Sequence, residues 1–102
     1  MEQQQSVANT IINQMGGFGK LAAMVNARNF VGDVDSVAFQ FSGHRKANKC
    51  KVTLLPSDFY RMEIGKMNSK TLEWEAIYDE SFLYDDMLKP EFEKTTGLDL
   101  SL

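Results

Sequence analysis

The 102-residue sequence has one cysteine, one histidine and two prolines. A single cysteine cannot form a disulfide within the chain, so we expect a reducing compartment such as the cytoplasm. A zinc site that included His44 and Cys50 would need two further ligands, and no spacing pattern in the sequence identifies them. We therefore predict no metal ion and no cofactor.

Long apolar runs are also missing from the sequence. No stretch of about 18 apolar residues occurs, which argues against a membrane-spanning helix. The first ten residues, MEQQQSVANT, have no basic region followed by an apolar block, so we expect no secretory signal. Hydrophobic residues make up 43% and charged residues 25% of the chain, which is typical of one globular domain over residues 1–102.

The chain has little excess charge, with a formal net charge of −3. This value excludes a global basic field that would draw the chain onto nucleic acid. The charges are nevertheless segregated. Residues 44–51 contain Arg45, Lys46, Lys49 and Lys51 and no acid, whereas residues 79–102 contain seven acids against two lysines. Both regions can be solvated surface, a polar binding face, or complementary faces in an oligomer.

Hydrophobic spacing predicts two short helices at the start of the chain. Residues 6–15 place apolar side chains four residues apart, and residues 18–27 have a mostly apolar surface. Gly16 and Gly17 interrupt the pattern, as glycine commonly does just beyond a helix C-terminus. The stretch "MGGFGKL" therefore separates two helices.

Beyond residue 30 the pattern changes to a period of two. Alternating apolar and polar side chains predict strands at residues 37–41, 50–55, 60–65 and 72–78. In the last of these, the apolar face is expected to consist of Leu72, Trp74, Ala76 and Tyr78. The short connections favour an antiparallel meander, and the two-sided pattern predicts a sheet covered on one face.

The last predicted element is a helix. Asp85 or Asp86 can cap its start, and Gly97 is suited to its end. Pro90 requires either a kink or a helix that begins near Lys89. The expected buried stripe consists of Tyr84, Leu88 and Phe92.

The leucine-rich tail at residues 98–102 is expected to dock as an extended segment. The predicted order of elements is α-α-β-β-β-β-α, and the fold class is α+β.

Four stretches of the sequence resemble a group of small proteins encoded by tailed phages, prophages and plasmids. They are "INQMGGFGKLAAMVNARNFV", "SVAFQFSGHRKANKCKVTL", "DFYRMEIGKM" and "TTGLDLSL". The resemblance extends from about Ile11 to Leu102, with Pro90 and Asp99 departing from the group's pattern near the last helix. It implies an origin in a mobile element and action inside a bacterial host. It implies no reaction and no catalytic residues.

The stretch "MGGFGKL" does not match a nucleotide-binding loop. A Walker loop ends in Gly-Lys-Ser/Thr, but Gly19-Lys20 is followed by Leu21. The residues Gly17-x-Gly19-x-x-Ala22 match the sequence pattern of a dinucleotide-binding motif. That motif follows a strand, however, and here a predicted helix comes before it. Backbone N–H groups at the second helix start, with Lys20 nearby, remain candidates for holding an anion.

Residues 44–51 form a second candidate site. The four cations Arg45, Lys46, Lys49 and Lys51, beside His44, can contact phosphates, with Phe39, Phe41 and Tyr60 in the flanking strands. The aromatic side chains alternate as core residues do, so a solvated hairpin and an acidic protein partner are the other interpretations.

Three further features have a functional and a structural interpretation. His44 and Cys50 flank one loop and can be drawn as a nucleophile pair, or as a surface histidine and a buried thiol. Trp74 can be core or interface. The pairs Asp79-Glu80 and Asp85-Asp86 can bind a metal loosely, although helix capping explains the second pair.

The sequence therefore predicts a non-enzymatic binding protein in the cytoplasm of a bacterial host cell. We expect it to inhibit or sequester a host protein, of which an anti-phage defence factor is one case, or a small nucleotide signal. The expected contact residues are Gly17, Gly19, Lys20, His44, Arg45, Lys46 and Lys49. The alternative is a nucleic-acid-binding accessory protein that uses the basic loop. Exposed sheet edges also allow a homodimer.

Overall fold

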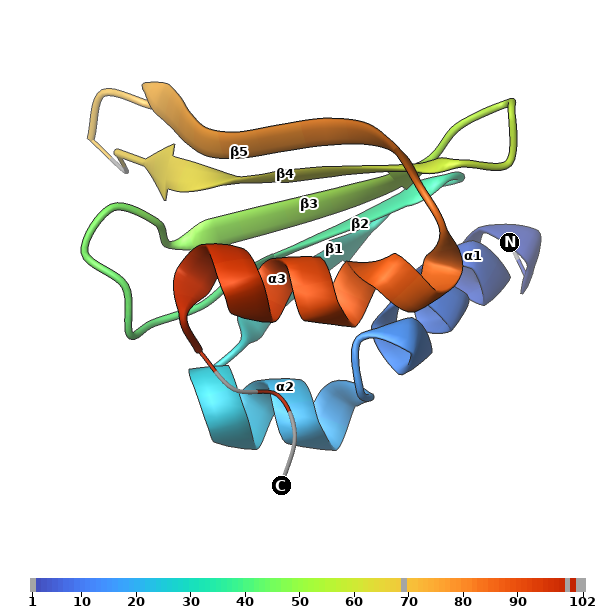
Figure 1. Ribbon diagram of the computed structural model, residues 1–102, viewed down its shortest axis with the longest axis horizontal. Coiled ribbons are helices and arrows are strands. Elements are labelled where there is room, and N and C mark those ends of the chain that lie inside the picture. The colour runs from blue at the N-terminus through green and yellow to red at the C-terminus, as the bar shows by residue number, and fades with distance from the viewer. Residues whose placement is uncertain (1, 69, 99, 101–102) are drawn as a thin grey trace.

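A computed structural model describes residues 2–68, 70–98 and 100, and for residues 2–6 it describes the backbone alone. The fold is α+β, as predicted (Figure 1). The elements in chain order are α1 (Glu2–Gln14), α2 (Phe18–Val25), β1 (Arg28–Gly32), β2 (Ser36–Gln40), β3 (Lys49–Leu54), β4 (Tyr60–Met67), β5 (Trp74–Leu83), the 3-10 turn η1 (Asp85–Met87) and α3 (Leu88–Thr96).

The five strands form one antiparallel meander in the order β1-β2-β3-β4-β5. The prediction of four strands was wrong, because β1 was missed. β1 is an edge strand in which Phe30 is partly buried and the other four residues are exposed. Its register also shifts between Arg28 and Val31, and Asn29 has a φ of 55°. An irregular edge strand does not produce the period-two pattern from which strands are predicted.

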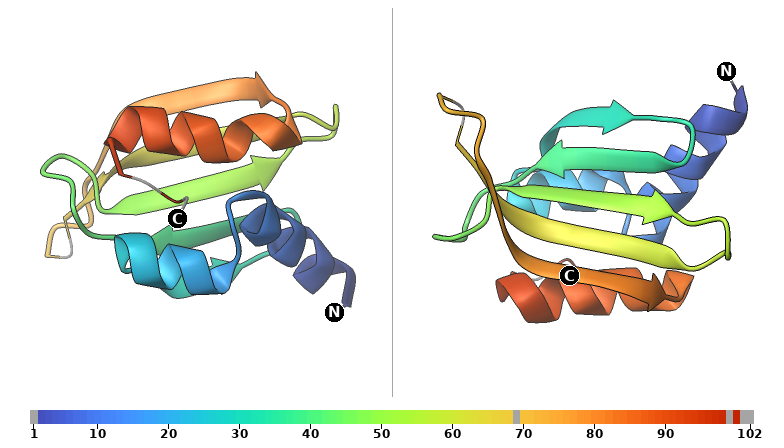
Figure 2. Two further views of the ribbon diagram at one scale, coloured as in Figure 1. Left: turned by 60° about the horizontal axis from the view of Figure 1, so that its bottom comes forward. Right: turned by 90° about the horizontal axis from the view of Figure 1, so that it is seen from above.

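The three helices lie on the same face of the sheet, and the other face is uncovered (Figures 1 and 2). This arrangement confirms the predicted one-sided cover. The buried core consists mainly of Ile11, Ile12, Met15, Leu21 and Val25 from the first two helices, Val37, Phe39, Cys50, Val52, Met62 and Ile64 from the sheet, Phe41 just beyond β2, and Leu88 and Phe92 from α3. Removing these side chains from water is the main source of stability.

The glycine pair between α1 and α2 is a structural break, as the sequence indicated. Gly16 and Gly17 have φ angles of 111° and 93°, which glycine adopts without steric cost. The Gly17 N–H donates to the Ile12 carbonyl at 2.9 Å, and the Gly17 carbonyl accepts from the Leu21 N–H at 3.1 Å. The pair thus closes the first helix and starts the second.

The last helix begins at Leu88, so Pro90 lies in its first turn, where a missing N–H costs little. The expected cap was wrong: Asp85 and Asp86 lie within η1, and the residues at the cap positions of η1 and α3 are Tyr84 and Met87. Gly97 ends the helix in a left-handed conformation, as predicted. Of the expected stripe, Leu88 and Phe92 are buried but Tyr84 is exposed and precedes the helix.

Strand β5 also differs from expectation. Leu72 is 72% exposed and lies before the strand, and Trp74 and Ala76 face away from the helices, so the prediction of a core Trp74 was wrong. The cause is a bulge, since Ile64 pairs with Tyr78 but Gly65 pairs with Ala76. One inserted residue reverses which side chains point inward.

The tail docks on the helical side of the sheet, as expected for the part that the structure describes. Leu100 is fully buried, and its N–H donates to Glu93 Oε2 at 2.8 Å. Leu98 is partly buried and packs close to Gly43. Residues 99 and 101–102, and with them the departure at Asp99, lie outside the described residues.

Candidate functional site

The Gly-Lys break and the basic loop lie toward opposite ends of α2. Gly17 precedes the helix and Lys20 is in its first turn, whereas the Val25 carbonyl at the other end accepts from the Ser42 N–H at 2.9 Å, just before the loop. Eight helical residues span about 12 Å. The structure therefore does not bring the break and the loop together into one small-ligand site.

The C-terminal segment runs between these two features. A side chain built at Gly43 would lie 3.0 Å from Leu98 Cδ2, and one built at Gly16 would lie 3.7 Å from the Leu100 carbonyl oxygen. Both glycines have positive φ angles, 107° at Gly43 and 111° at Gly16. Glycine at position 43 thus lets Leu98 lie directly against the loop, and at Gly16 the tail comes within ordinary contact distance of the break. Gly19 and Lys20 are exposed at the start of α2.

The basic loop is ordered by its own contacts. His44 is half-buried, and its Nδ1 accepts from the Lys46 N–H at 3.0 Å. The Arg45 carbonyl accepts from Lys66 Nζ on β4 at 3.4 Å. Asn48 anchors the end of the loop to Met67, donating to its carbonyl at 3.2 Å and accepting from its N–H at 2.9 Å.

Lys49 is separated from the other predicted contact residues because it lies on the uncovered face of the sheet. Cys50 and Val52 are buried beneath the helices, so the alternation of β3 places Lys49 and Lys51 on the opposite face. Across the sheet, Lys51 pairs with Ala38 and with Glu63, and Glu63 pairs with Asp79. We name this uncovered face the open face. Its members on the central and β5-side strands are Ala38, Gln40, Lys49, Lys51, Thr53, Arg61, Glu63, Gly65, Met67, Trp74, Ala76 and Asp79.

A hollow of about 190 Å³ lies on the open face, lined by Lys49, Lys51, Glu63, Met67 and Trp74. Across the sheet, Lys49 pairs with Gly65 on β4, and Gly65 pairs with Ala76 on β5. These two residues contribute almost no side-chain volume. This absence of bulk leaves room beside Trp74, which is 37% exposed. Trp74 also borders a larger open hollow of about 670 Å³ at the β4–β5 hairpin.

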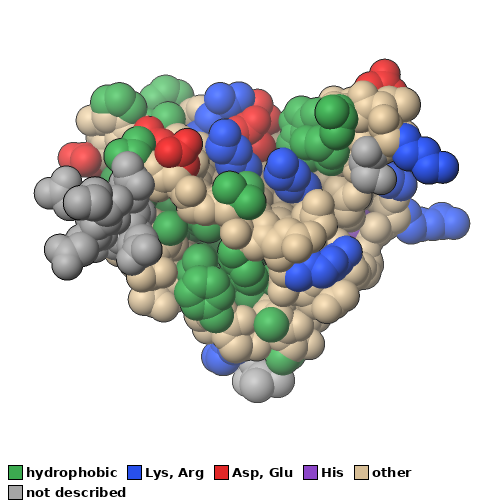
Figure 3. Space-filling model, turned by 180° about the vertical axis from the view of Figure 1, so that it is seen from behind, with side chains coloured by type: hydrophobic (Ala, Val, Ile, Leu, Met, Phe, Trp, Pro, Cys, Tyr) green, Lys and Arg blue, Asp and Glu red, His purple; other side chains and the backbone are tan. Residues whose placement is uncertain are grey.

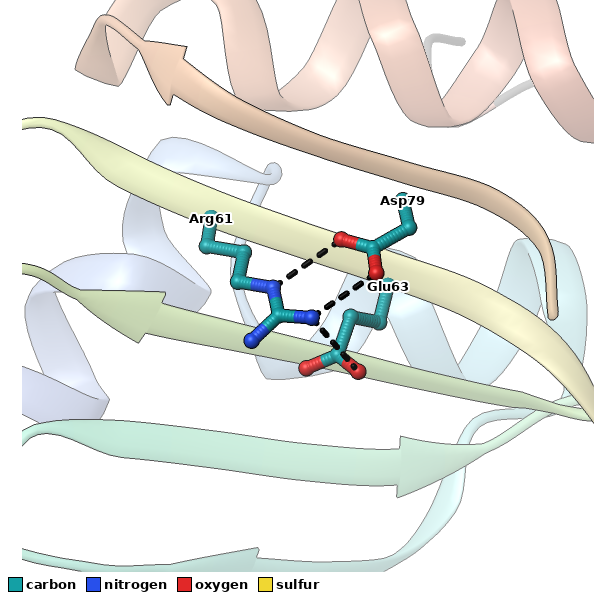
Figure 4. A network of polar contacts seen from close by, with 3 residues as sticks. All are labelled: Arg61, Glu63 and Asp79. Carbon is teal, nitrogen blue, oxygen red and sulfur yellow. Dashed lines mark hydrogen bonds and ion pairs between the residues drawn. The ribbon is translucent and has the colours of Figure 1, made fainter.

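Arg61 organises the charges of the open face (Figure 4). Its Nε and Nη2 donate to Asp79 Oδ1 and Oδ2 at 2.9 and 2.8 Å, and Nη2 lies 3.7 Å from Glu63 Oε2. The two-pronged hydrogen bond lowers the pKa of Asp79 below its ordinary value and raises the pKa of Arg61. Because the network is exposed, it contributes little to folding stability and mainly fixes the geometry of the face.

The face as a whole has mixed charge. Lys49, Lys51 and Arg61 stand beside Glu63 and Asp79, with the apolar surface of Trp74 and Met67 next to them. In the upper part of Figure 3, Lys and Arg side chains lie close to Asp and Glu side chains, with hydrophobic groups to both sides. Such a surface offers an aromatic anchor and both signs of charge to a partner.

The structure buries Cys50, one of the two residues that can be drawn as a nucleophile pair. Cys50 is fully buried on the helical side of the sheet, and burial, with a smaller effect of Glu63, raises the pKa of its thiol. His44 makes its hydrogen bond within the loop. The interpretation as a buried structural thiol is therefore confirmed. Among the described residues, no group of three or more His, Cys, Asp or Glu side chains could hold a metal ion.

Comparisons of the chain with protein-family models, with curated proteins and with solved structures returned no match. Within the described part of the chain, no helix is both long and apolar enough to cross a membrane.

The sequence named Lys51 as a nucleic-acid contact and Trp74 as a core or interface residue, but it did not predict that these two residues and Arg61 share the open face. For Lys51 the sequence did hold a signal, because it alternates with the buried pair Cys50 and Val52. The position of Trp74 depends on the bulge in β5, and the pairing of Arg61 with Asp79 depends on strand register. Neither can be read from the local pattern alone.

Proposed function

We propose that the protein is a non-catalytic binding protein of mobile-element origin that acts in the bacterial cytoplasm. Its open face binds a host protein and thereby blocks or redirects that protein. A factor of anti-phage defence is the target that best fits a small protein of such origin. The sequence resemblance supports the origin, and the uncovered sheet face supports the mode of action.

The observation that carries this proposal is the hollow beside Trp74. Tryptophan, methionine and arginine are enriched in the cores of protein interfaces, and exposed tryptophan is a frequent binding hot spot. Trp74 is 37% exposed next to Met67, in a hollow rimmed by Lys49, Lys51 and Glu63. The Arg61–Asp79 pair adjoins it and adds a fixed pattern of charge, which provides specificity in a protein interface.

The proposal is tested by affinity capture from extracts of several bacterial strains. The variant is Trp74→Ala with Lys51→Glu, and the matched control is Ala23→Glu with Lys94→Glu, at exposed positions of α2 and α3. We expect one stoichiometric partner that the open-face variant loses and the control variant retains. Equal capture by both variants would contradict the proposal.

A biological measurement complements the capture. Cells carrying different defence systems are infected with phage while they express the wild type, the open-face variant or the control variant. Rescue of infection by the wild type and the control, but not by the open-face variant, is expected in at least one strain. Rescue that is unchanged by the open-face substitutions would show that another surface carries the function.

Single-stranded nucleic acid is the second candidate ligand. Lys49 and Lys51 adjoin Trp74, and a cation beside an exposed aromatic ring is the combination that single-stranded binders use. Glu63 and Asp79 on the same face oppose phosphate binding, which ranks this candidate second. The test is retention of single-stranded DNA or RNA at low salt, which charge reversal at Arg45 and Lys46 and substitution of Lys49 and Lys51 should abolish.

A small nucleotide signal is the remaining ligand class. Because the break and the loop are separated, each would have to bind the nucleotide independently. Thermal unfolding with a panel of cyclic and linear nucleotides tests this class, since a ligand bound to the folded state raises the melting temperature. An unchanged melting temperature across the panel would remove it.

A further inference from the structure

A cluster of three aromatic rings, two of them exposed, lies where β3, β4 and β5 meet the start of η1. Phe59 lies in the turn before β4, Phe82 near the end of β5, and Tyr84 just before η1. The ring centroids of Phe59 and Phe82 are 5.7 Å apart, and those of Phe59 and Tyr84 are 5.3 Å apart. Phe82 is 68% exposed and Tyr84 is 60% exposed. We name these residues the aromatic cluster.

The backbone holds Phe82 outward in an unfavourable conformation. Its φ is 66°, in the left-handed region that bulky side chains rarely adopt. The register shifts here, because Met62 pairs with Glu80 while Tyr60 pairs with Leu83. The bulge keeps Leu83 buried and leaves the ring of Phe82 in solvent. Strain of this kind, without burial in return, is characteristic of functional surfaces.

Acidic residues lie close to the aromatic cluster in the sequence. The segments that carry the rings, residues 55–60 and 80–87, contain Asp58, Glu80, Asp85 and Asp86 and no Lys, Arg or His. Asp85 and Asp58 both come close enough to Tyr60 to raise its pKa, after the larger effect of burial. The cluster thus combines exposed ring faces with a concentration of negative charge.

We propose that the aromatic cluster docks a basic segment of a partner protein, with an arginine side chain stacked on the rings of Phe82 and Tyr84. A guanidinium group is attracted by the face of an aromatic ring, and nearby carboxylates add electrostatic attraction. The ring of Phe59 packs against both of these exposed rings. This contact is additional to the proposed binding at the open face, and it depends on different residues.

The charge of the surroundings decides which occupant fits. Asp58, Asp85 and Asp86 repel nucleic acid and anionic lipid. A symmetric dimer through this surface would place the same acids opposite one another. The chain's own basic loop lies at the other end of the sheet (Figure 1), so its docking on a second copy would be head-to-tail and would form rings or open polymers. A basic segment of a different protein can contact the rings and the carboxylates without repulsion between like charges and without head-to-tail assembly.

The test uses the full chain and a labelled peptide, Gly-Arg-Gly-Arg-Gly-Arg-Gly, with a control peptide in which citrulline replaces arginine. Citrulline keeps the shape of arginine and removes its charge. By fluorescence anisotropy at low salt, we expect the arginine peptide to bind at least tenfold more tightly than the citrulline peptide. Equal binding of the two peptides would overturn the proposal.

Variants locate the site. Phe82→Ala with Tyr84→Ala should weaken binding at least tenfold, and Trp74→Ala on the open face should leave it unchanged. Asp85→Asn with Asp86→Asn keeps the rings, and we expect it to weaken binding at least threefold. If Trp74→Ala alone removes binding, or if both cluster variants bind normally, the aromatic cluster is not the site.

Sedimentation of the peptide-free protein tests whether a second copy of the chain occupies the aromatic cluster. We expect a sedimentation coefficient that does not change with protein concentration. Concentration-dependent polymers that disappear in the Phe82→Ala, Tyr84→Ala variant would show that a second copy occupies the cluster, and they would overturn the proposal.

Discussion

Gly65 is a residue at which β4 and β5 approach each other closely. A methyl group built there would lie 2.3 Å from the Glu75 carbonyl oxygen and 2.7 Å from the Ala76 Cα, both of them backbone atoms. Gly65→Ala therefore forces the strands apart at the bulge. We expect the free energy of unfolding, measured with urea, to fall by about 2 kcal/mol or more.

The control for this substitution is Gly19→Ala in α2. Nothing lies within 4 Å of a side chain built at Gly19, and alanine favours a helix over glycine. We expect Gly19→Ala to raise the free energy of unfolding by up to about 1 kcal/mol. Equal effects of the two substitutions on the free energy of unfolding would show that β4 and β5 do not approach closely at Gly65.

The Arg61–Asp79 pair predicts a measurable titration. Because the hydrogen bond from Arg61 lowers the pKa of Asp79, the bonded carboxylate should persist below the pH at which an ordinary aspartate is protonated. Its small contribution to stability is present above the unfolded-state pKa and is lost as the pH falls through the folded-state pKa. Carboxyl NMR should show a lowered Asp79 midpoint that returns to the ordinary value in Arg61→Gln. An ordinary midpoint in the wild type would contradict the pairing.

At the scale of elements, Tyr78 joins β5 to α3. Its hydroxyl donates to Glu91 Oε1 at 3.0 Å, and burial, followed by the effect of Glu91, raises its pKa above the ordinary value of 10.0. The unfolded chain therefore loses this proton at a lower pH than the folded chain does. The corresponding stability is complete below about pH 10 and decreases as the pH rises above it.

The comparison that isolates this effect is Tyr78→Phe. We expect the melting temperature of the wild type to fall more steeply above pH 10 than that of Tyr78→Phe. Parallel curves for the wild type and Tyr78→Phe would show that Tyr78 ionises equally in both states.

The docked tail makes a second prediction at this scale. Leu100 is fully buried and is held by the hydrogen bond to Glu93. Leu100→Ala should reduce the free energy of unfolding by about 2–3 kcal/mol, because a buried leucine loses its contacts. Leu72→Ala, at a position 72% exposed, should change it by less than about 0.5 kcal/mol. Equal values for the two variants in urea denaturation would mean that the tail does not dock.

The elements that the sequence predicted are those with a regular pattern. Strands β2, β3 and β4 show the period of two, and Gly16 and Gly17 mark the break between α1 and α2. The irregular elements were missed or misplaced. β1 has one half-buried side chain. In β5 a bulge reverses which side chains point inward, and the local sequence pattern does not predict this bulge.

At the scale of the whole molecule, the candidate site could be predicted only in part. Lys49 was among the predicted contacts and lines the hollow of the open face together with Lys51, whereas Arg45 and Lys46 line a different hollow. The open face forms from strands that are far apart in the sequence, such as those of Lys51 and Asp79. Its composition depends on register, which tertiary packing decides.

The central claim is that the open face is the surface that binds a host protein. The most direct measurement is photo-crosslinking in living bacterial cells, with benzoylphenylalanine placed at Thr53 on the open face or at Ala23 on α2. Both positions tolerate a larger side chain because neither is buried. We expect a single protein adduct from position 53 and none from position 23. Adducts from position 23 alone, or equally from both positions, would contradict it.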